Sequence, residues 1–261
     1  MSEIAIYPSL KNKNVLITGG ASGIGKSLVE KFLEQGCKVA FIDKEKDLGE
    51  NLIKTLNKYN DMLYFKTCDL IDISNLKKTI NEFKNEIGKF SIVVNNAADD
   101  SRHNIDEVTP EIWDTKLNIN LRHFFFTIKY TYNDMKDLGG GSIINIGSSS
   151  WMKSSGGMPG YTTAKSAVSG LTKTLARDLG IFNIRVNCVV PGFIMTEKQL
   201  KHLSLKSPGY ETGMKEDIIK RQCIKRDLLP EDISNVVLFF ASDQSNGCTS
   251  QNYIVDGGVV R

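Results

Sequence analysis

Three side chains near the middle of the chain have types and spacing suited to proton transfer. Tyr161 and Lys165 lie four positions apart, and Ser148 precedes the tyrosine by 13 residues. Residues four apart share one face of a helix, so the lysine ammonium would lie beside the phenol. A tyrosine with its ordinary pKa of about 10 is a poor base at neutral pH, and a neighbouring cation favours its phenolate. With the Ser148 hydroxyl holding a substrate oxygen, the phenolate could take the proton of an alcohol.

A Tyr-x-x-x-Lys pair alone is common on helix surfaces and does not indicate catalysis. A glycine-rich segment near the N-terminus, suited to binding a nucleotide, favours a catalytic role for this pair. Glycines at 19, 23 and 25 follow a short apolar run, in the spacing G-x-x-x-G-x-G. Without a Cβ the backbone can turn sharply and approach a pyrophosphate, while the following helix offers unpaired N–H groups. A tight turn without a ligand is the alternative, and the position at the first strand–helix junction argues against it. The predicted cofactor contacts of this turn are Gly19, Ser22, Gly23, Ile24 and Gly25.

Asp43 indicates which dinucleotide this turn would serve. It ends the second predicted strand, 18 residues after Gly25. A carboxylate there can accept hydrogen bonds from both adenosine ribose hydroxyls and would repel a 2′-phosphate. Ser22 stands where a basic residue could hold that phosphate, and Lys44 would point away from Asp43 if the strand continued. The pattern favours NAD over NADP.

Two further strand ends carry residues suited to the nucleotide. Asp69 and Leu70 end the third predicted strand, where an aspartate can meet the adenine amino group. Asn96 lies in the segment Asn95–Ala98 at the end of the fourth. The small residues of this segment would let the backbone pass close to the ribose, at the point where the strand order reverses.

The pattern of hydrophobic residues predicts the strands and helices that must position these residues. Short β-branched runs, most of them apolar on both faces, alternate with helix-length segments, as in a parallel sheet covered by helices on both sides. Helices are expected from Ile24 to Gly36, from about Thr162 to Leu179, and from Pro230. Seven strands are expected at Val15–Thr18, Val39–Ile42, Leu63–Thr67, Ile92–Asn95, Ser142–Ile146, Arg185–Val190 and Tyr253–Val255.

The whole chain, residues 1–261, is therefore expected to form a single α/β domain with a doubly wound (Rossmann) sheet. It contains no internal repeat, low-complexity tract or linker. The segment from about 197 to 229 lacks clear periodicity. In a compact domain a long irregular segment is more often functional than a spacer, so we expect a substrate lid there.

Composition excludes several classes of protein. The net charge of +3 is spread along the chain without a basic stripe, which argues against nucleic-acid binding. The five cysteines contain no Cys-x-x-Cys pair and the three histidines have no metal-ligand spacing, so free thiols and no metal site are expected. No secretory leader or apolar run of membrane-spanning length is present in the sequence, which predicts a soluble cytoplasmic protein.

Taken together, these motifs resemble those of the short-chain dehydrogenase/reductase superfamily over nearly the full chain. The resemblance implies hydride transfer with a nicotinamide cofactor. It makes Asn120 a fourth catalytic residue holding a proton-relay water near Lys165, and disfavours Asn118, because Asn120 directly precedes Leu121. It also implies that Ile194 and Thr196 contact the nicotinamide carboxamide. The matching stretches are Thr18–Gly25, Asp69–Leu70, Asn95–Ala97, Asn120–Leu121, Ser148, Tyr161–Lys165, Pro191–Gly192 with Thr196, and Asp256–Gly258.

The same resemblance implies a homotetramer built on helices around residues 111–135 and 162–179 and on the C-terminal strand. Three positions depart from the family pattern: Ala98 stands where glycine usually ends the Asn-Asn-Ala-Gly motif, Gly147 replaces a common serine, and Ser250 replaces a frequent glycine. None of them removes a reacting group, so activity is expected.

Within the superfamily the chain most resembles bacterial sugar 1-dehydrogenases of the D-xylose type, which oxidise an aldose to its lactone. Trp151, just beyond Ser148, could stack on a sugar face or merely pack in the lid. Asp99 and Asp100 could accept sugar hydroxyls. Arg102–His103 fits a loop anchor better than a substrate contact. The stretches that carry this resemblance are Ala5–Lys11, Arg102–His103, Asn118–His123, Ser150–Trp151 and Cys188–Gly192.

Alternative activities stay open at this point. A 3-oxoacyl-carrier-protein reductase would use NADPH, against which Asp43 argues, and a basic docking patch, which is not evident. Oxidation of another secondary alcohol would use the same residues. A non-catalytic NAD-binding regulator would need no phenol paired with a lysine, so the presence of Asn120, Ser148, Tyr161 and Lys165 argues against it.

Overall fold

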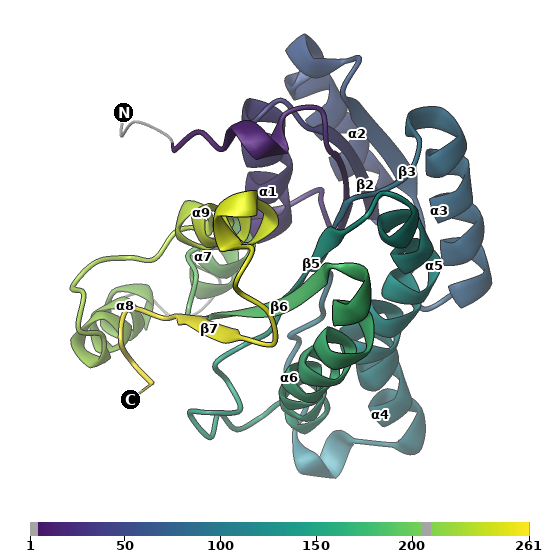
Figure 1. Ribbon diagram of the computed structural model, residues 1–261. Helices are drawn as coiled ribbons and strands as arrows, with labels where there is room; N and C mark the ends of the chain where they lie inside the picture. The colour runs from purple at the N-terminus through teal and green to yellow at the C-terminus, as the bar shows by residue number, and fades with distance from the viewer. Residues whose placement is uncertain (1–4, 205–209, 261) are drawn as a thin grey trace.

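A single parallel sheet forms the centre of the molecule (Figure 1). The computed structural model describes residues 5–204 and 210–260, without the side chains of 202–214. Within that part of the chain the strand order is β3-β2-β1-β4-β5-β6-β7, and every pair is parallel. The strands are β1 (Asn14–Thr18), β2 (Lys38–Asp43), β3 (Leu63–Thr67), β4 (Ile92–Asn95), β5 (Gly141–Ile146), β6 (Ile184–Pro191) and β7 (Asn252–Val255).

Helices cover both faces of the sheet. α1 and α9 pack side by side on one face, and α3, α5 and α6 cover the other. α4 packs against α6, and α7 contacts α8, which lies beyond the end of β7 in Figure 1. The helices are α1 (Gly23–Glu34), α2 (Lys46–Thr55), α3 (Ile73–Ile87), α4 (Pro110–Leu117), α5 (His123–Asp137), α6 (Pro159–Leu179), α7 (Glu197–Ser204), α8 (Tyr210–Arg221) and α9 (Pro230–Ala241).

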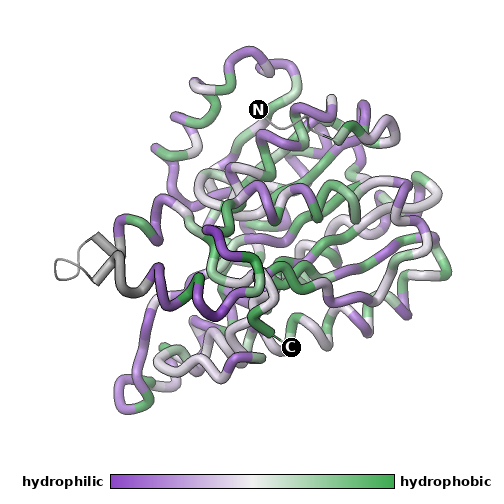
Figure 2. Tube along the Cα trace, turned by 90° about the vertical axis from the view of Figure 1, so that its left-hand side faces the viewer, coloured by the Kyte–Doolittle hydropathy of each residue, from purple (hydrophilic) through white to green (hydrophobic). Residues whose placement is uncertain are grey.

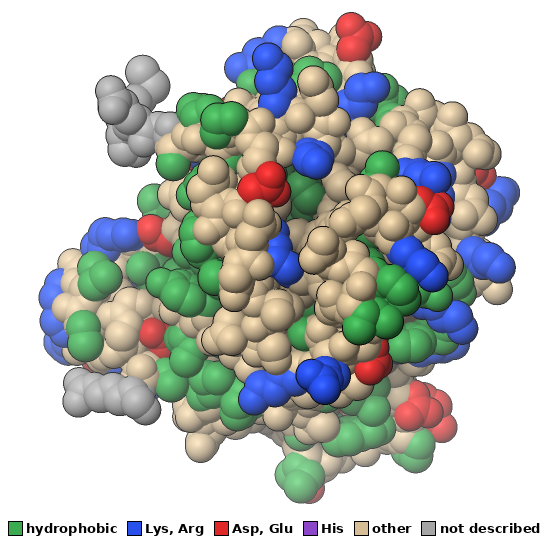
Figure 3. Space-filling model, in the orientation of Figure 1, with side chains coloured by type: hydrophobic (Ala, Val, Ile, Leu, Met, Phe, Trp, Pro, Cys, Tyr) green, Lys and Arg blue, Asp and Glu red, His purple; other side chains and the backbone are tan. Residues whose placement is uncertain are grey.

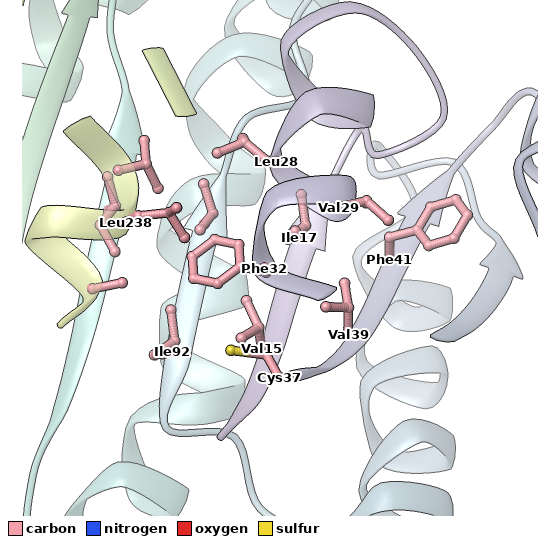
Figure 4. Close-up of a cluster of buried hydrophobic side chains, with 14 of the residues drawn as sticks. Val15, Ile17, Leu28, Val29, Phe32, Cys37, Val39, Phe41, Ile92 and Leu238 are labelled. Carbon is pink, nitrogen blue, oxygen red and sulfur yellow. The ribbon is translucent and has the colours of Figure 1, made fainter. Parts of the chain in front are cut away.

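Two hydrophobic clusters, one on each face of the sheet, form the core. Val15 and Ile17 belong to the cluster under α1 and α9, whereas Leu16 belongs to the one under α3 and α5, as the period of two in a strand requires. All three side chains are fully buried. Figure 4 shows the first cluster, with Phe32 of α1 between sheet and helices, and Figure 2 shows the hydrophobic strands in the interior. The two clusters therefore confirm the doubly wound sheet that was predicted from strands apolar on both faces.

The reversal of strand order lies between β1 and β4, which are neighbours although β2 and β3 separate them in sequence. The chain leaves β1 and β4 in opposite directions, so a crevice opens beyond their carboxyl ends. The segments that follow these two strands, Thr18–Gly25 and Asn96–Asp100, are thereby placed at one mouth.

The boundaries of all seven strands agree with the sequence prediction to within one residue. The prediction of an irregular segment at 197–229 was wrong. That segment contains α7 and α8, although residues 205–209 lie outside the described part. Its two ends are joined beside the sheet, because the Met195 N–H donates to the Leu228 carbonyl at 2.8 Å. The segment is therefore a helical insertion that leaves and rejoins the sheet at one place.

Two departures from the family pattern have local causes. A Cβ at Gly147 would lie 2.8 Å from Cys188 Sγ, so the buried thiol occupies the space that a serine would need. Ser250 has a φ of 64°, in the left-handed region that glycine adopts without strain, which explains why glycine is frequent there. Among the described helices, none is long and apolar enough to cross a membrane.

Candidate active site

The glycine-rich turn forms a cradle in which side chains do not fit. Gly19 has a φ of 68°, and a Cβ on it would lie 2.7 Å from Ala97 Cα. A Cβ on Gly25 would lie 1.8 Å from the Gly19 carbonyl oxygen. Ser22 precedes α1 without making a side-chain cap, and no acidic residue lies in the first turn. The helix therefore presents its N–H groups and positive dipole end to an anion, which fits a dinucleotide pyrophosphate.

Thr18 and Asn96 lock the ends of β1 and β4 together beside this cradle. The Asn96 amide donates to the carbonyls of Thr18, at 3.1 Å, and Gly19, at 2.9 Å. In return the Thr18 hydroxyl accepts from the N–H groups of Asn96, at 3.0 Å, and Ala97, at 3.2 Å. These four bonds fix the floor of the crevice before any ligand binds.

Asp43 lies at the end of β2 with its carboxylate held in one orientation. One oxygen accepts from the Ala21 N–H at 3.0 Å and the other from the Glu45 N–H at 3.1 Å. Each carboxylate oxygen keeps a further lone pair that can accept a ribose hydroxyl. β2 ends at Asp43, so the condition on which Lys44 was expected to point away is not met. Lys44 borders the crevice, and its Nζ lies 3.9 Å from the Glu45 carboxylate.

Ser148, from the loop that follows β5, and Tyr161 and Lys165, from α6, converge on the same crevice. α6 begins at Pro159, three residues before the predicted start, so Tyr161 lies in its first turn and Lys165 one turn later. The Ser148 hydroxyl lies 3.1 Å from the Ser150 hydroxyl and borders the same crevice as Tyr161. Lys165 is buried, and its Nζ donates to the Ile146 carbonyl at 2.7 Å.

Burial dominates the titration of this pair. It raises the pKa of Tyr161 to about 12, although the neighbouring Ser148 hydroxyl lowers it. Burial also lowers the pKa of Lys165 to about 8. The Lys165 Nζ lies 5.9 Å from the centroid of the Tyr161 ring, and its hydrogen bond goes to a carbonyl. In the chain without cofactor, burial therefore penalises both charged forms, and a phenolate favoured by Lys165 together with a bound nicotinamide ring stays a prediction.

Asn120 is fully buried in a π-helical turn, Asn118–Arg122, between α4 and α5. Its side-chain oxygen accepts from the Asp99 N–H at 2.9 Å, while its NH₂ donates to the carbonyls of Asp99, at 3.1 Å, and Lys116, at 2.9 Å. The side chain thus anchors the segment after β4, and its role toward a proton-relay water stays a prediction. Asn118 is partly exposed, with Oδ1 3.5 Å from an Arg122 nitrogen.

One crevice of about 900 Å³ joins the nucleotide cradle to the catalytic trio. Neither Asn120 nor Trp151 is among its described lining residues. The Trp151 Nε1 is buried without a hydrogen-bond partner among the described residues. Arg102 donates to the Gly156 carbonyl at 3.0 Å, in keeping with a loop anchor. The predicted residues that line the crevice are Gly19, Ser22, Gly23, Ile24, Gly25, Asp43, Asp69, Leu70, Asn96, Ser148, Tyr161, Lys165, Ile194 and Thr196.

Sequence reasoning missed the rim formed by α7. Lys198 Nζ lies 2.6 Å from one Asp100 oxygen, and the Gln199 amide donates to the other at 3.1 Å. Asp99 is paired instead with Lys116, whose Nζ lies 2.6 Å away. Burial opposes ionisation of Asp99, but the hydrogen bonds from Lys116 and Ser101 outweigh it and lower its pKa to about 2. No local sequence signal joins residues 98 positions apart, so only the fold reveals this rim.

Comparison with known proteins shows the family. A family model described as enoyl-(acyl carrier protein) reductase matches residues 19–260. The chain is 40% identical to D-xylose 1-dehydrogenase of Caulobacter vibrioides (strain NA1000 / CB15N) over 254 residues, which cover 97% of this chain and 98% of that protein. The chain belongs to the short-chain dehydrogenase/reductase family.

Other members of the short-chain dehydrogenase/reductase family give the same picture. The chain is 41% identical to a protein of Rhizobium meliloti (strain 1021) described as a probable galactose dehydrogenase, covering 97% of each chain. Ligand-free aldohexose dehydrogenase of Thermoplasma acidophilum superposes with a TM-score of 0.87 at 27% identity, covering 97% of this chain and 96% of that one. The protein is thus an oxidoreductase acting on CH–OH groups with a nicotinamide cofactor.

Proposed function

We propose that this enzyme oxidises the anomeric carbon of a cyclic aldose, a pentose or hexose of the D-xylose type, to the aldonolactone with NAD. The observation that carries the proposal is the continuity of one crevice from Asp43, through the glycine cradle, to Tyr161. The identities of 40% and 41% with sugar dehydrogenases support the substrate class.

In this proposal each catalytic side chain has one task. The bound dinucleotide supplies a hydride acceptor and a positive ring. Tyr161, with its pKa raised to about 12 in the free chain, becomes a base when positive charge enters its buried site, and takes the proton of the anomeric hydroxyl. Ser148 donates a hydrogen bond to the same substrate oxygen. Lys165 contributes its positive charge and Asn120 holds the surrounding backbone.

The rim of the crevice supports a polyhydroxylated substrate. Asp100, Lys198 and Gln199 are polar, converge over the catalytic end, and border the same crevice as Tyr161. Charged and amide groups can exchange their mutual bonds for those of sugar hydroxyls. Trp151, three residues after Ser148, does not line the described crevice in the chain without substrate, and its stacking on a sugar stays a proposed contact.

A panel of pentoses and hexoses with each cofactor tests this function, following reduced nicotinamide. We expect D-xylose or a related aldose with NAD to give the highest kcat/KM and a lactone product. Reduction of a 3-oxoacyl thioester with NADPH, faster than any sugar oxidation, would instead favour the carrier-protein reductase that the family description suggests. On the face in Figure 3, basic and acidic side chains of the described residues are interspersed, and no continuous basic patch gathers there.

Asp43→Ala should narrow the preference for NAD over NADP by about tenfold or more. The carboxylate accepts from ribose hydroxyls and repels a 2′-phosphate, and a lost bond to a charged group is worth about 1.5–3 kcal/mol. The measurement is the ratio of kcat/KM for the two cofactors. Asp69→Ala is the matched control, because its carboxylate faces the proposed adenine site and should weaken both cofactors equally. An unchanged ratio in Asp43→Ala would refute the ribose assignment.

The proposed assembly is a homotetramer. Phe125 of α5 is 41% exposed, and Tyr253 of β7 is 52% exposed. Such apolar side chains lie on the helical face and on the C-terminal strand through which the family resemblance implies subunit contacts.

A further inference from the structure

The loop after β4, residues 99–103, connects two catalytic segments by hydrogen bonds. At one end the Asn120 side chain is bonded to both the N–H and the carbonyl of Asp99, at 2.9 and 3.1 Å. In the middle, Lys116 Nζ contacts the Asp99 carboxylate at 2.6 Å and the Ser101 hydroxyl. The loop is therefore held rigidly before it reaches His103.

His103 forms the other end of this connection, and it is only 5% exposed. Its Nδ1 lies 2.9 Å from the Ser101 carbonyl oxygen, and its Nε2 lies 3.1 Å from the Gly160 nitrogen. The His103 N–H donates to the Gly157 carbonyl at 3.0 Å. The imidazole thus joins the loop after β4 to the first turn of α6, 57 residues away.

These two ring contacts require one form of the imidazole. A carbonyl oxygen can only accept, so Nδ1 must carry the hydrogen; a backbone N–H can only donate, so Nε2 must be bare. Both contacts exist together only in the neutral Nδ1–H tautomer. A doubly protonated ring would lose the Gly160 bond and place a cation at the positive end of a helix dipole.

Helix α6 has no cap from its own N-terminal residues. Met158 makes no side-chain cap, and Pro159 has no N–H, so the first N–H of the helix is that of Gly160. A Cβ on Gly160 would lie 2.9 Å from Lys116 Cβ and 3.3 Å from His103 Nε2, so imidazole and helix are in close contact. Tyr161 is the next residue, and its place depends on this turn.

We propose that His103 is a positioning residue that caps α6 through Nε2 and so holds the Tyr161 phenol in line with Ser148. The inference rests on the proposed role of Tyr161 as the proton-transfer group. Without the cap the first turn can fray, and a displacement of about 1 Å at a reacting group can cost about 10²-fold in rate. His103 touches the helix and the loop, and acts on the reaction only through Tyr161.

Two amide substitutions separate the cap from the rest of the side chain. In His103→Gln the longer side chain places an oxygen near the position of Nε2 and keeps an acceptor for Gly160. In His103→Asn the shorter side chain reaches only the position of Nδ1, so the bond to Ser101 survives and the cap is lost. We expect His103→Asn to lower kcat by about 30-fold, with KM and NAD affinity within about threefold, and His103→Gln to retain at least about a third of kcat.

The outcomes are distinct. A wild-type kcat in His103→Asn would overturn the inference, and so would an equal loss of kcat in His103→Asn and His103→Gln. A loss of NAD affinity in His103→Asn that matches its loss of kcat would also overturn it, because it would indicate a general structural role. If Tyr161→Phe abolishes turnover while His103→Asn does not, the positioning role alone fails. Normal turnover of Tyr161→Phe would overturn both proposals.

A measurement on the unaltered protein covers the case in which a variant does not fold. The chain has three histidines, so ¹⁵N–¹H correlation spectra of their side chains can be assigned. At neutral pH the His103 ring should show the Nδ1–H tautomer with an unprotonated Nε2. An Nε2–H tautomer or an imidazolium would contradict the cap.

Discussion

Tyr161→Phe should lower the turnover of the best aldose by about 10³-fold or more while leaving NAD binding nearly intact. The substitution removes one oxygen and keeps the ring, and general acid–base catalysis by a positioned side chain is worth about 10²–10⁴-fold. Because the ring remains and the cradle for the dinucleotide lies on other elements, the affinity for NAD should change by less than about threefold. The rate is read from reduced nicotinamide and the affinity from a direct NAD titration.

Tyr64→Phe is the matched control for this substitution. Tyr64 of β3 loses the same atom, and its hydroxyl donates to the Asp61 carbonyl at 3.1 Å, away from the crevice. Its turnover should equal that of the wild type. A near-normal rate in Tyr161→Phe would remove Tyr161 as the base and, with it, the reason to place the reaction at this end of the crevice.

The sheet was predictable because its signal is local. A strand buried on both faces is a short apolar run whichever way its side chains point, as Val15–Thr18 shows. The glycine cradle was predictable for a similar reason. The turn of eight residues, Thr18–Gly25, requires a positive φ at Gly19 and leaves no room for a Cβ at Gly25, so both glycines mark it in the sequence.

The helical boundaries were harder to predict wherever apolar periodicity and turn residues conflict. Pro159 and Gly160 look like the end of a loop, yet proline suits the first position of a helix, so α6 begins there. In the segment after Thr196 the apolar residues Tyr210, Met214 and Ile218 recur every four positions, but Gly213 interrupts the pattern and α8 was missed.

The remaining contacts of the site join segments that are far apart in the sequence, so no local sequence pattern predicts them. The bond between Lys198 and Asp100 spans 98 positions, and that between Gly160 and His103 spans 57. The raised pKa of Tyr161 in the chain without cofactor could not be predicted for the same reason: spacing reveals a neighbouring cation, whereas burial depends on how α6 packs against the sheet. Sequence motifs therefore identify the reacting groups, and the fold determines their protonation.

Lys165→Met should lower turnover by about 10²-fold or more and yet raise the stability of the folded protein at neutral pH. The loss of rate follows from removing a positive charge beside a group that must become an anion. The gain in stability follows from burial, which lowers the pKa of Lys165 from 10.5 to about 8. At about 1.36 kcal/mol per pKa unit, keeping this ammonium buried costs up to about 3 kcal/mol. In Lys165→Met the Ile146 carbonyl loses its hydrogen-bond donor, which offsets part of this relief. The free energy of unfolding should therefore rise by about 1 kcal/mol.

The pH dependence of unfolding separates these two contributions. Below pH 8 both folded and unfolded chains carry the proton on Lys165, so the full cost of the buried charge is present. Between pH 8 and 10.5 the unfolded chain binds a proton that the folded chain has released, and linkage then requires the wild type to gain stability as pH rises. The advantage of Lys165→Met, measured by denaturant unfolding, should therefore shrink across this interval, whereas the orphaned Ile146 carbonyl contributes equally at every pH. A constant difference between the two proteins from pH 7 to 10.5 would show that the ammonium is solvated in the folded state, and the electrostatic role given to Lys165 would then be wrong.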